Sequence, residues 1–398
     1  MVGQTMLPFS RKLSLRIKMK RRLIRHTIYF LVAGCITHPA WINAQDIPGQ
    51  YRESFAESFP IREHQHLAVK KYVDGLIENE KKWAFTRFHP DFSGKRQYEK
   101  SLVPYRKKLA ESFGYPPPLA RRGSEPRIVM AGRDSVCTLY RVWIRVAEGI
   151  EAYGLYMLPH DIEGKTPLLI CQHGGGGNPE AICDLDTRIN YRSFGHEAVK
   201  RGYIVWAPGL VMRCGYASDP PIEGAERDLL DRGLKLVGTS IIGVELQMII
   251  ESTKTLIRYR PEIDPDRIGM TGLSWGGFYT LHAAALCPEI KVAVPSASFR
   301  GHEAILSRID DPENPSTRYD FQMFGNAQVA GMVCPRPLMI QMGTRDTLFD
   351  LESVGREVKK AAEIYNRLGV GELFEYSEHP GGHVFENESI FAFFKKHL

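Results

Sequence analysis

The residues that most clearly indicate chemistry form the pattern Gly-x-Ser-x-Gly at positions 272–276. An apolar run precedes the serine, and residues 276–286 have the apolar spacing of a helix. A sharp strand-to-helix turn holds a serine in a strained backbone conformation that exposes its hydroxyl group, provided that its neighbours lack bulk, as Gly272 and Gly276 do. We therefore predict that Ser274 is a nucleophile, and that the backbone N–H of Trp275 points at a developing oxyanion.

A serine hydroxyl needs a base to remove its proton, and the base needs an acid to fix its tautomer. Asp346 follows the apolar run 337–342, and His383 lies in a glycine-containing loop after the last predicted strand. The order serine, acid, histidine along the chain is the one this kind of turn requires. The sequence predicts the catalytic triad Ser274, Asp346 and His383.

Two positions of this triad have rivals in the sequence. His379 competes with His383, which is favoured because the two glycines before it let its loop approach closely. Asp350 competes with Asp346, and Glu303 is a further alternative acid.

A second glycine cluster, residues 174–177, follows the apolar run 168–172. Backbone N–H groups in such a loop can approach a substrate oxygen closely. Gly175 and Gly176 are therefore predicted to complete the oxyanion hole with Trp275. A phosphate-binding loop is disfavoured because no Lys-Ser/Thr pair follows the glycines. No Cys/His cluster has metal-ligand spacing, and the predicted chemistry requires no cofactor.

Three weaker candidates lie near these motifs. His282, inside the apolar helix after the serine, is expected to be a hydrogen-bonded core residue. Arg213 either reaches a substrate carboxylate or oxyanion, or is an ordinary surface residue. Residues 297–334 form a polar stretch longer than an ordinary connection and are predicted to contribute a lid or substrate wall.

The elements that must position these residues alternate along the chain from about residue 131. Short apolar runs indicate strands and longer amphipathic runs indicate helices, which predicts an α/β fold with a doubly wound, mostly parallel sheet. The sequence predicts a hairpin at the edge of the sheet, formed by strands at 136–146 and 151–158. Residues 45–130 are predicted to form a helical extension or cap, with helices at 67–83 and 98–113, before a catalytic domain at 131–398.

Residues 1–44 resemble an export signal. The first 27 residues carry eight Lys or Arg and no acid, and an apolar stretch, 28–36, too short to span a bilayer follows. Translation from Met19 would shorten the long basic segment. Cleavage after Ala44 predicts a periplasmic or secreted protein, whereas the lipobox-like Val32-Ala33-Gly34-Cys35 predicts a lipoprotein anchored at Cys35. The remaining chain has 44 basic and 46 acidic residues, which gives no indication of nucleic-acid binding.

Six cysteines remain beyond Cys35, in a compartment that permits disulfides. Cys171 and Cys287 lie in apolar runs and are expected to be small buried residues. Cys183 and Cys214 are a possible loop disulfide.

With these motifs in place, residues 136–398 resemble the α/β-hydrolase superfamily. Within it, the serine turn, the Gly343-Thr344-Arg345-Asp346 segment and the Gly381-Gly382-His383 segment resemble acetyl xylan esterase-type and dienelactone hydrolase-like exported enzymes. The resemblance implies ester hydrolysis, with carbohydrate esters a frequent substrate class. Dienelactone hydrolases carry a cysteine nucleophile, so their lactone chemistry does not transfer to Ser274.

The sequence leaves other functions open. The serine turn also resembles that of prolyl oligopeptidase-type peptidases, but the N-terminal part here is too short for their β-propeller. Glucuronoyl esterases have a basic residue after the serine, where this chain has Trp275. A peptidase acting on short peptides and a non-catalytic binding module of the same fold are the alternatives to an esterase.

Overall fold

The computed structural model describes residues 53–79, 87–185, 189–211, 224–301 and 324–398. The chain divides into two compact units, residues 1–70 and 71–398. The predicted export signal, Cys35 and Ala44 lie outside the described residues. In the described ranges no single helix is long and apolar enough to cross a membrane. The helices at 226–236 and 241–259, joined by a sharp bend, together have the length and composition of a membrane span.

The N-terminal part contains two helices, whose bounds differ from those predicted. Helix α2 (Phe55–Glu78) starts earlier than the predicted helix at 67–83. Its start is fixed by a capping box, in which Ser54 N donates to Glu57 Oε2 at 2.7 Å and Glu57 N donates to Ser54 Oγ at 3.2 Å. Helix α4 (Lys95–Ser112) is the predicted helix at 98–113.

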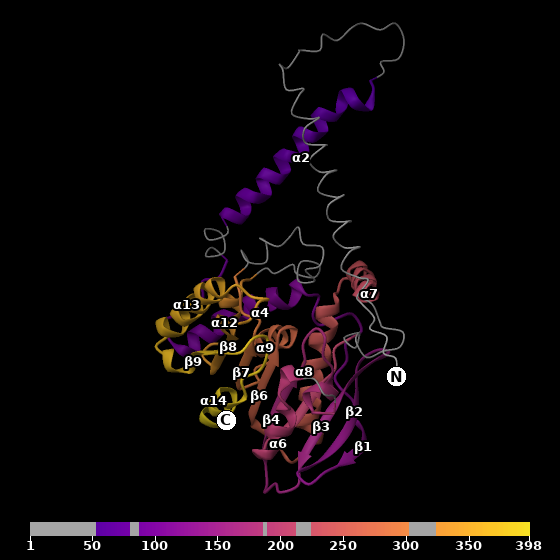
Figure 1. Cartoon of the computed structure of the whole chain (residues 1–398), viewed down its shortest axis with the longest axis vertical. Helices are drawn as coiled ribbons and strands as arrows, with labels where there is room; N and C mark the ends of the chain where they lie inside the picture. The colour runs from indigo at the N-terminus through magenta and orange to yellow at the C-terminus, as the bar shows by residue number, and fades with distance from the viewer. Residues whose placement is uncertain (1–52, 80–86, 186–188, 212–223, 302–323) are drawn as a thin grey trace, which may run out of the picture. The chain divides into compact units, whose positions relative to one another are not determined.

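Unit 71–398 contains a nine-stranded sheet with the order β1-β2-β3-β5-β4-β6-β7-β8-β9 (Figure 1). The three N-terminal strands and the β3–β5 pair are antiparallel, and all pairs from β5 to β9 are parallel, which confirms the predicted α/β fold. The strands are β1 (Arg127–Arg133), β2 (Cys137–Ala147), β3 (Ile150–Pro159), β4 (Thr166–Gln172), β5 (Ile204–Pro208), β6 (Ile263–Leu273), β7 (Val292–Ser296), β8 (Leu338–Gly343) and β9 (Phe374–His379).

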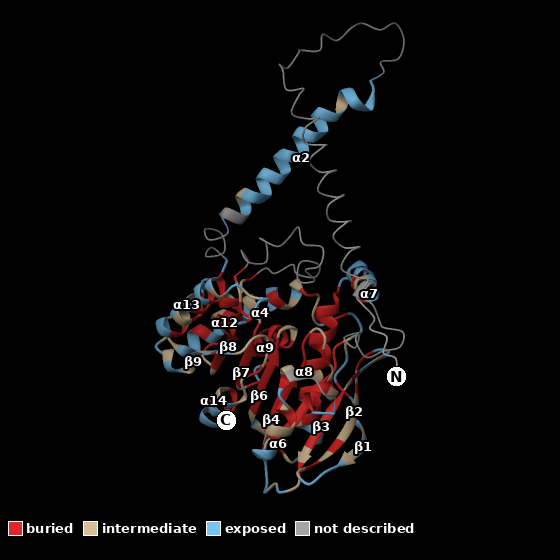
Figure 2. Ribbon diagram, viewed as in Figure 1, coloured by how far each residue is buried: buried red, intermediate tan, exposed pale blue. Residues whose placement is uncertain are grey.

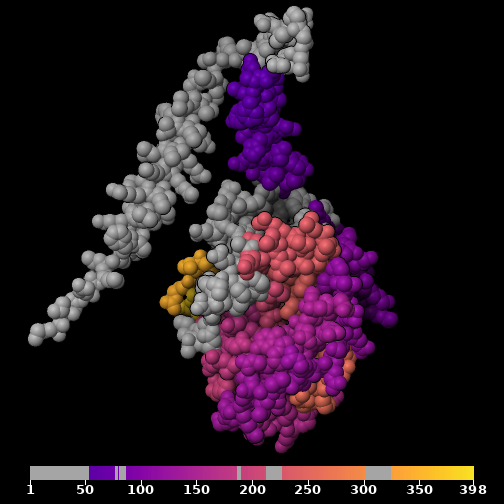
Figure 3. Space-filling view, turned by 90° about the vertical axis from the view of Figure 1, so that its right-hand side faces the viewer, coloured from indigo at the N-terminus to yellow at the C-terminus, as the bar shows by residue number. Residues whose placement is uncertain are grey.

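The predicted hairpin is confirmed as β2 and β3, but β1 rather than β2 forms the sheet edge. Most residues of β1 are exposed, so its sequence lacks the apolar alternation that marks a half-buried strand. Residues coloured purple and magenta, the part of the chain that includes β1 to β3, make up much of the face seen in Figure 3.

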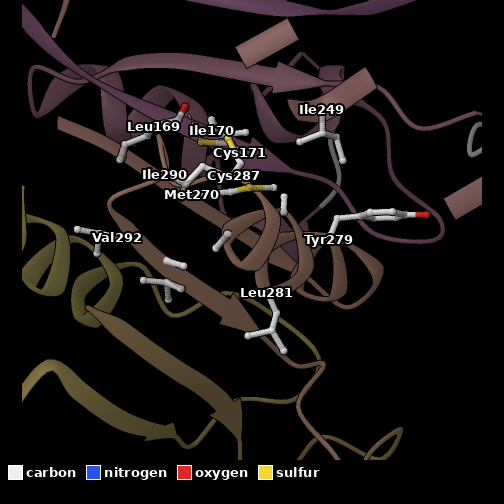
Figure 4. Close-up of a cluster of buried hydrophobic side chains, with 14 of the residues drawn as sticks. Leu169, Ile170, Cys171, Ile249, Met270, Tyr279, Leu281, Cys287, Ile290 and Val292 are labelled. Atoms are coloured by element: carbon white, nitrogen blue, oxygen red, sulfur yellow. Dashed lines mark hydrogen bonds between the residues drawn. The ribbon is translucent and has the colours of Figure 1, made fainter. Parts of the chain in front are cut away.

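Helices cover both faces of this sheet. Adjacent residues of a strand point to opposite faces. A Cβ on Gly269 of β6 would contact Phe394 of α14 (Asn387–His397), at 2.8 Å. The side chain of Met270 instead belongs to the cluster that includes Ile249 of α8 (Ile241–Tyr259) and Leu281 of α9 (Trp275–Leu286) (Figure 4). The remaining helices are α5 (Pro179–Ile182), α6 (Phe194–Lys200), α7 (Gly224–Leu236), α12 (Asn326–Val333) and α13 (Leu351–Arg367), with 3-10 turns η1 (Ile189–Tyr191) and η2 (Gly371–Leu373).

The core fills the space between the sheet and these helices (Figure 2). Strands β5, β7 and β8 are buried along their whole length. Cys171 and Cys287 are buried free thiols in this core, as predicted (Figure 4). Burial raises the pKa of the Cys287 thiol to about 12, so it remains protonated. Cys183 is also a buried free thiol, and its possible partner Cys214 lies outside the described residues.

The predicted long connection at 297–334 contains helix α12, which the sequence did not indicate. Helix α4 packs against it, because Tyr98 donates to the carbonyl of Gly331 at 2.7 Å and Arg106 donates to the carbonyl of Met332 at 2.6 Å. Residues 302–323, including the alternative acid Glu303, lie outside the described residues.

A buried ion pair joins α7 to α8. Glu245 is fully buried and accepts two hydrogen bonds from the Arg227 guanidinium, both 2.8 Å long. It also accepts from the backbone N–H of Val211 at 2.8 Å and from the hydroxyl of Tyr279. Burial alone would lower the pKa of Arg227, but the Glu245 carboxylate reverses this and raises it. The Arg227 guanidinium therefore stays charged inside the fold.

Replacing Glu245 by leucine is expected to lower the free energy of unfolding by about 3–5 kcal/mol, because it leaves the Arg227 charge buried without a partner. The double variant Arg227→Met/Glu245→Leu removes both charges and is expected to lose much less. Urea denaturation of the two variants and the wild type measures this difference. Equal losses in the single and double variants would contradict the explanation.

Candidate active site

The Gly-x-Ser-x-Gly motif forms the predicted strand-to-helix turn between β6 and α9. Ser274 has φ 61° and ψ −119°, the strained conformation expected for this turn. A Cβ on Gly272 would lie 2.3 Å from the Gly276 carbonyl oxygen, and one on Gly276 would lie 2.1 Å from the Gln172 carbonyl oxygen. Only glycine fits at these two positions, and Ser274 is left partly exposed at the end of the strand.

The predicted acid and base lie together. His383 Nδ1 is 2.7 Å from Asp346 Oδ2, and the Asp346 side chain is fully buried while 24% of the His383 side chain is exposed. The other Asp346 oxygen accepts the backbone N–H of Leu348 at 2.9 Å. A carboxylate that accepts from Nδ1–H leaves Nε2 as the basic nitrogen, which is the arrangement a general base requires.

The parallel sheet places this pair on the same edge as the serine. Ser274 follows β6, Asp346 follows β8 and His383 follows β9, and the carboxyl ends of parallel strands meet at one edge of a sheet. Among the described contacts, the Ser274 hydroxyl makes no hydrogen bond with His383. Such bonds are commonly long in a ligand-free enzyme and shorten when substrate binds.

The rival residues have other contacts. Asp350 caps helix α13, where its carboxylate accepts the backbone N–H groups of Glu352 and Ser353 at 3.2 and 3.1 Å. His379 is buried, and its Nδ1 accepts the N–H of Gly381 at 3.1 Å. Burial lowers the pKa of His379. These contacts support Asp346 and His383 over their rivals.

The loops that carry the acid and the histidine are bound to each other along their backbones. Thr344 N donates to the carbonyl of His379 at 2.8 Å, and Arg345 N donates to that of Gly381 at 3.0 Å. A Cβ on Gly343 would lie 2.2 Å from the Gly382 carbonyl oxygen, so this close approach requires glycine. The glycine of the Gly343-Thr344-Arg345-Asp346 segment is visible in the sequence, but the sequence alone does not reveal that it lies against the Gly382 carbonyl.

The ring of Phe349 is a neighbour of His383 that the sequence analysis did not identify. The two rings are stacked at an angle of 9° with centroids 6.0 Å apart, and the Arg300 guanidinium lies 5.2 Å from the Phe349 centroid. No sequence motif marks this contact, because Phe349 lies in an irregular loop before α13.

The second glycine cluster lies against the serine turn. A Cβ on Gly174 would lie 2.7 Å from the Leu273 carbonyl oxygen and 3.2 Å from Ser274 Cβ. Gly174 N donates to the hydroxyl of Tyr191 at 2.8 Å, and Gly177 N donates to the carbonyl of Gly174 at 3.2 Å. The N–H groups at both ends of the loop therefore have partners inside the protein, and the predicted donors Gly175 and Gly176 form its partly exposed tip.

His173 holds the start of this loop. Its Nε2 accepts the N–H of Leu210 at 3.0 Å, which leaves Nδ1 to donate to the Gly174 carbonyl at 3.0 Å. These two contacts require a neutral imidazole. Arg213, which the sequence placed just beyond Leu210, lies outside the described residues. In the described ranges no group of three or more His, Cys, Asp or Glu side chains could hold a metal ion.

His282 is the buried core histidine that the sequence predicted. Its Nδ1 lies 2.8 Å from the Phe278 carbonyl oxygen, and its ring centroid lies 4.0 Å from that of Phe278. Burial lowers the pKa of His282 to about 4. The folded protein therefore keeps this imidazole neutral at pH values where an unfolded chain protonates it.

Stability is expected to fall as the pH falls from about 6.5 to 4, because in this window the unfolded state binds a proton at His282 that the folded state does not. The expected loss is about 3 kcal/mol. Urea denaturation at several pH values, with wild type and His282→Gln, measures it. His379 contributes in the same direction, so the relevant quantity is the difference between the two proteins. Identical pH profiles would contradict this role for His282.

Comparison with known proteins gives distant similarities. No protein-family model matches the chain. YtaP of Bacillus subtilis (strain 168), whose assignment as a hydrolase is itself provisional, is 26% identical over 243 residues, 58% of this chain and 78% of YtaP. The alpha/beta hydrolase gkaG of Penicillium citrinum is 27% identical over 177 residues, 40% of this chain and 36% of gkaG.

Solved structures with similar folds include proteins named as esterases. A protein from Bacteroides fragilis NCTC 9343, provisionally assigned as an acetyl xylan esterase, matches with TM-score 0.56 and 17% identity over 74% of this chain and 80% of its own. A glucuronoyl esterase of carbohydrate esterase family 15 from Caldicellulosiruptor kristjansonii matches with TM-score 0.52 and 18% identity, over 77% and 87% of the two chains. These similarities confirm the predicted fold.

Proposed function

We propose that this chain, an α/β-hydrolase by its fold, is a serine esterase that hydrolyses carboxylic esters, with carbohydrate esters as its substrate class. The observation that carries the proposal is the 2.7 Å contact between His383 and the buried Asp346, on the sheet edge that also holds Ser274. The esterases among the structural neighbours and the hydrolase names of the sequence relatives support it.

In the proposed mechanism Ser274 Oγ attacks the ester carbonyl carbon while His383 Nε2 removes its proton. Asp346 holds the imidazole in the required tautomer and stabilises the imidazolium ion that forms. Backbone N–H groups of Trp275, Gly175 and Gly176 stabilise the negative charge on the carbonyl oxygen. His383 then protonates the leaving alcohol, and water, activated by the same imidazole, releases the acid from the acyl-enzyme.

The location of the enzyme is part of the proposal. The basic and apolar N-terminal segment supports export to the periplasm or medium, or anchoring as a lipoprotein at Cys35. Expression of the full chain followed by mass determination of its mature N-terminus distinguishes cleavage after Ala44 from lipidation.

The deciding assay is acid release from acetylated plant oligosaccharides by the purified mature protein, with Ser274→Ala as the control. Acetate release that depends on Ser274 supports the proposal. Methanol release from a methyl glucuronate ester instead would assign the glucuronoyl ester class that some neighbours hydrolyse. Cleavage of short peptides without ester cleavage would favour the peptidase alternative, and inactivity of a folded protein on all three would favour a binding module.

A further inference from the structure

Tyr191 is a buried residue that touches both ends of the glycine loop beside Ser274. It lies at the end of the 3-10 turn η1 and only 1% of it is exposed. Its hydroxyl oxygen accepts the N–H of Gly174 at 2.8 Å. At the other end of the loop, a Cβ on Gly177 would lie 2.1 Å from the same oxygen. The tyrosine hydroxyl therefore fixes the position of the Gly174 N–H at the start of the loop, and Gly177 at its end packs directly against the same hydroxyl.

The same short segment also contacts the loop that carries His383. The carbonyl of Asn190 accepts the N–H of Phe385, two residues beyond His383, at 3.0 Å. The rings of Tyr191 and Phe385 lie 6.0 Å apart. One residue further on, the carbonyl of Arg192 accepts from the Asn387 side chain at 2.9 Å. Residues 190–192 thus connect two loops that are far apart in sequence.

The backbone immediately after Tyr191 is strained. Arg192 and Ser193 have φ values of 48° and 54°, the left-handed region that residues with side chains seldom adopt. Two such residues in succession persist only where surrounding contacts determine the conformation. The contacts of residues 190, 191 and 192 hold the backbone in this conformation.

We propose that Tyr191 is a positioning residue that holds the oxyanion-hole loop and the His383 loop in fixed relative positions. The proposal depends on the esterase function above. Oxyanion donors stabilise the transition state only at about 2.7–3.1 Å from the charged oxygen, and the loss of one donor costs about 10²–10³ in kcat. Loss of the hydroxyl at Tyr191 releases the Gly174 peptide, which shifts the neighbouring donors without removing them.

The test compares Tyr191→Phe with Tyr98→Phe. Both tyrosines are fully buried, and each hydroxyl makes a hydrogen bond to the backbone, with Tyr98 donating to Gly331 at 2.7 Å between α4 and α12. With p-nitrophenyl acetate, Tyr191→Phe is expected to lower kcat by about 10- to 100-fold with KM nearly unchanged. Tyr98→Phe is expected to retain wild-type kcat, although it should lose about as much thermal stability as Tyr191→Phe. Equal kcat values for the two variants would overturn the proposal.

A second measurement does not depend on substrate. Hydrogen–deuterium exchange of peptides covering residues 173–177 and 384–388 is expected to be faster in Tyr191→Phe than in wild type, and unchanged in Tyr98→Phe. Unchanged exchange in Tyr191→Phe, or an increase in one loop only, would overturn the coupling. If wild type hydrolyses no ester, the esterase function fails, while the exchange data still decide whether Tyr191 connects the loops.

Discussion

Replacing Ser274 by alanine is expected to lower kcat for ester hydrolysis on the order of a million-fold, because the reaction loses its nucleophile and the base has no hydroxyl to activate. The fold is expected to remain, since Gly272 and Gly276 provide the close contacts of the turn and the serine is partly exposed. Measuring kcat and KM on p-nitrophenyl acetate and on an acetylated oligosaccharide tests the prediction.

Ser240→Ala is the matched serine control. Ser240 caps α8, where its hydroxyl accepts the N–H of Gly243 at 3.1 Å and donates to the Phe113 carbonyl at 2.7 Å. Its loss is expected to cost about 1 kcal/mol of stability and to leave kcat close to wild type. Labelling by a fluorophosphonate, followed by intact mass, should modify wild type and Ser240→Ala but not Ser274→Ala. Near-normal turnover by Ser274→Ala would exclude the serine mechanism.

Replacing Asp346 by asparagine is expected to lower kcat by about 10⁴-fold with KM little changed. The asparagine amide can donate to His383 Nδ1, which selects the wrong tautomer and removes the negative charge that stabilises the imidazolium ion. Because Asp346 is fully buried and in contact with His383 at 2.7 Å, no water is expected to substitute for it. Steady-state kinetics of the purified variant measure the loss.

Asp350→Asn is the control for this variant. Asparagine caps a helix about as well as aspartate, so α13 should be retained and kcat should remain within a few-fold of wild type. The opposite pattern, a large loss in Asp350→Asn and a small one in Asp346→Asn, would reassign the acid. A large loss in both, with folding retained, would indicate that the loop between them is required as a whole.

The serine turn, the glycine loop and the alternating strands and helices were predictable, because each depends on local constraints such as apolar spacing or the lack of a side chain at Gly272 and Gly276. The helix after the serine and the strand that leads to Asp346 match their predicted positions to within a few residues. Strand β1 was missed because most of its residues are exposed and show no apolar alternation. Helix α12 was missed because it has only eight residues and is buried on almost all sides, so it lacks the polar face of an amphipathic helix.

The sequence by itself determined the order of the chemistry along the chain: a serine on a strained turn, then an acid, then a histidine. It left two histidines and several acids as candidates, because contact between distant loops depends on strand register rather than on local pattern. The pairing of β8 with β9 brings Asp346 to His383 and leaves Asp350 as a helix cap. Likewise, only the tertiary structure places Tyr191 on the glycine loop, since the two are separated along the chain and meet through packing against the sheet.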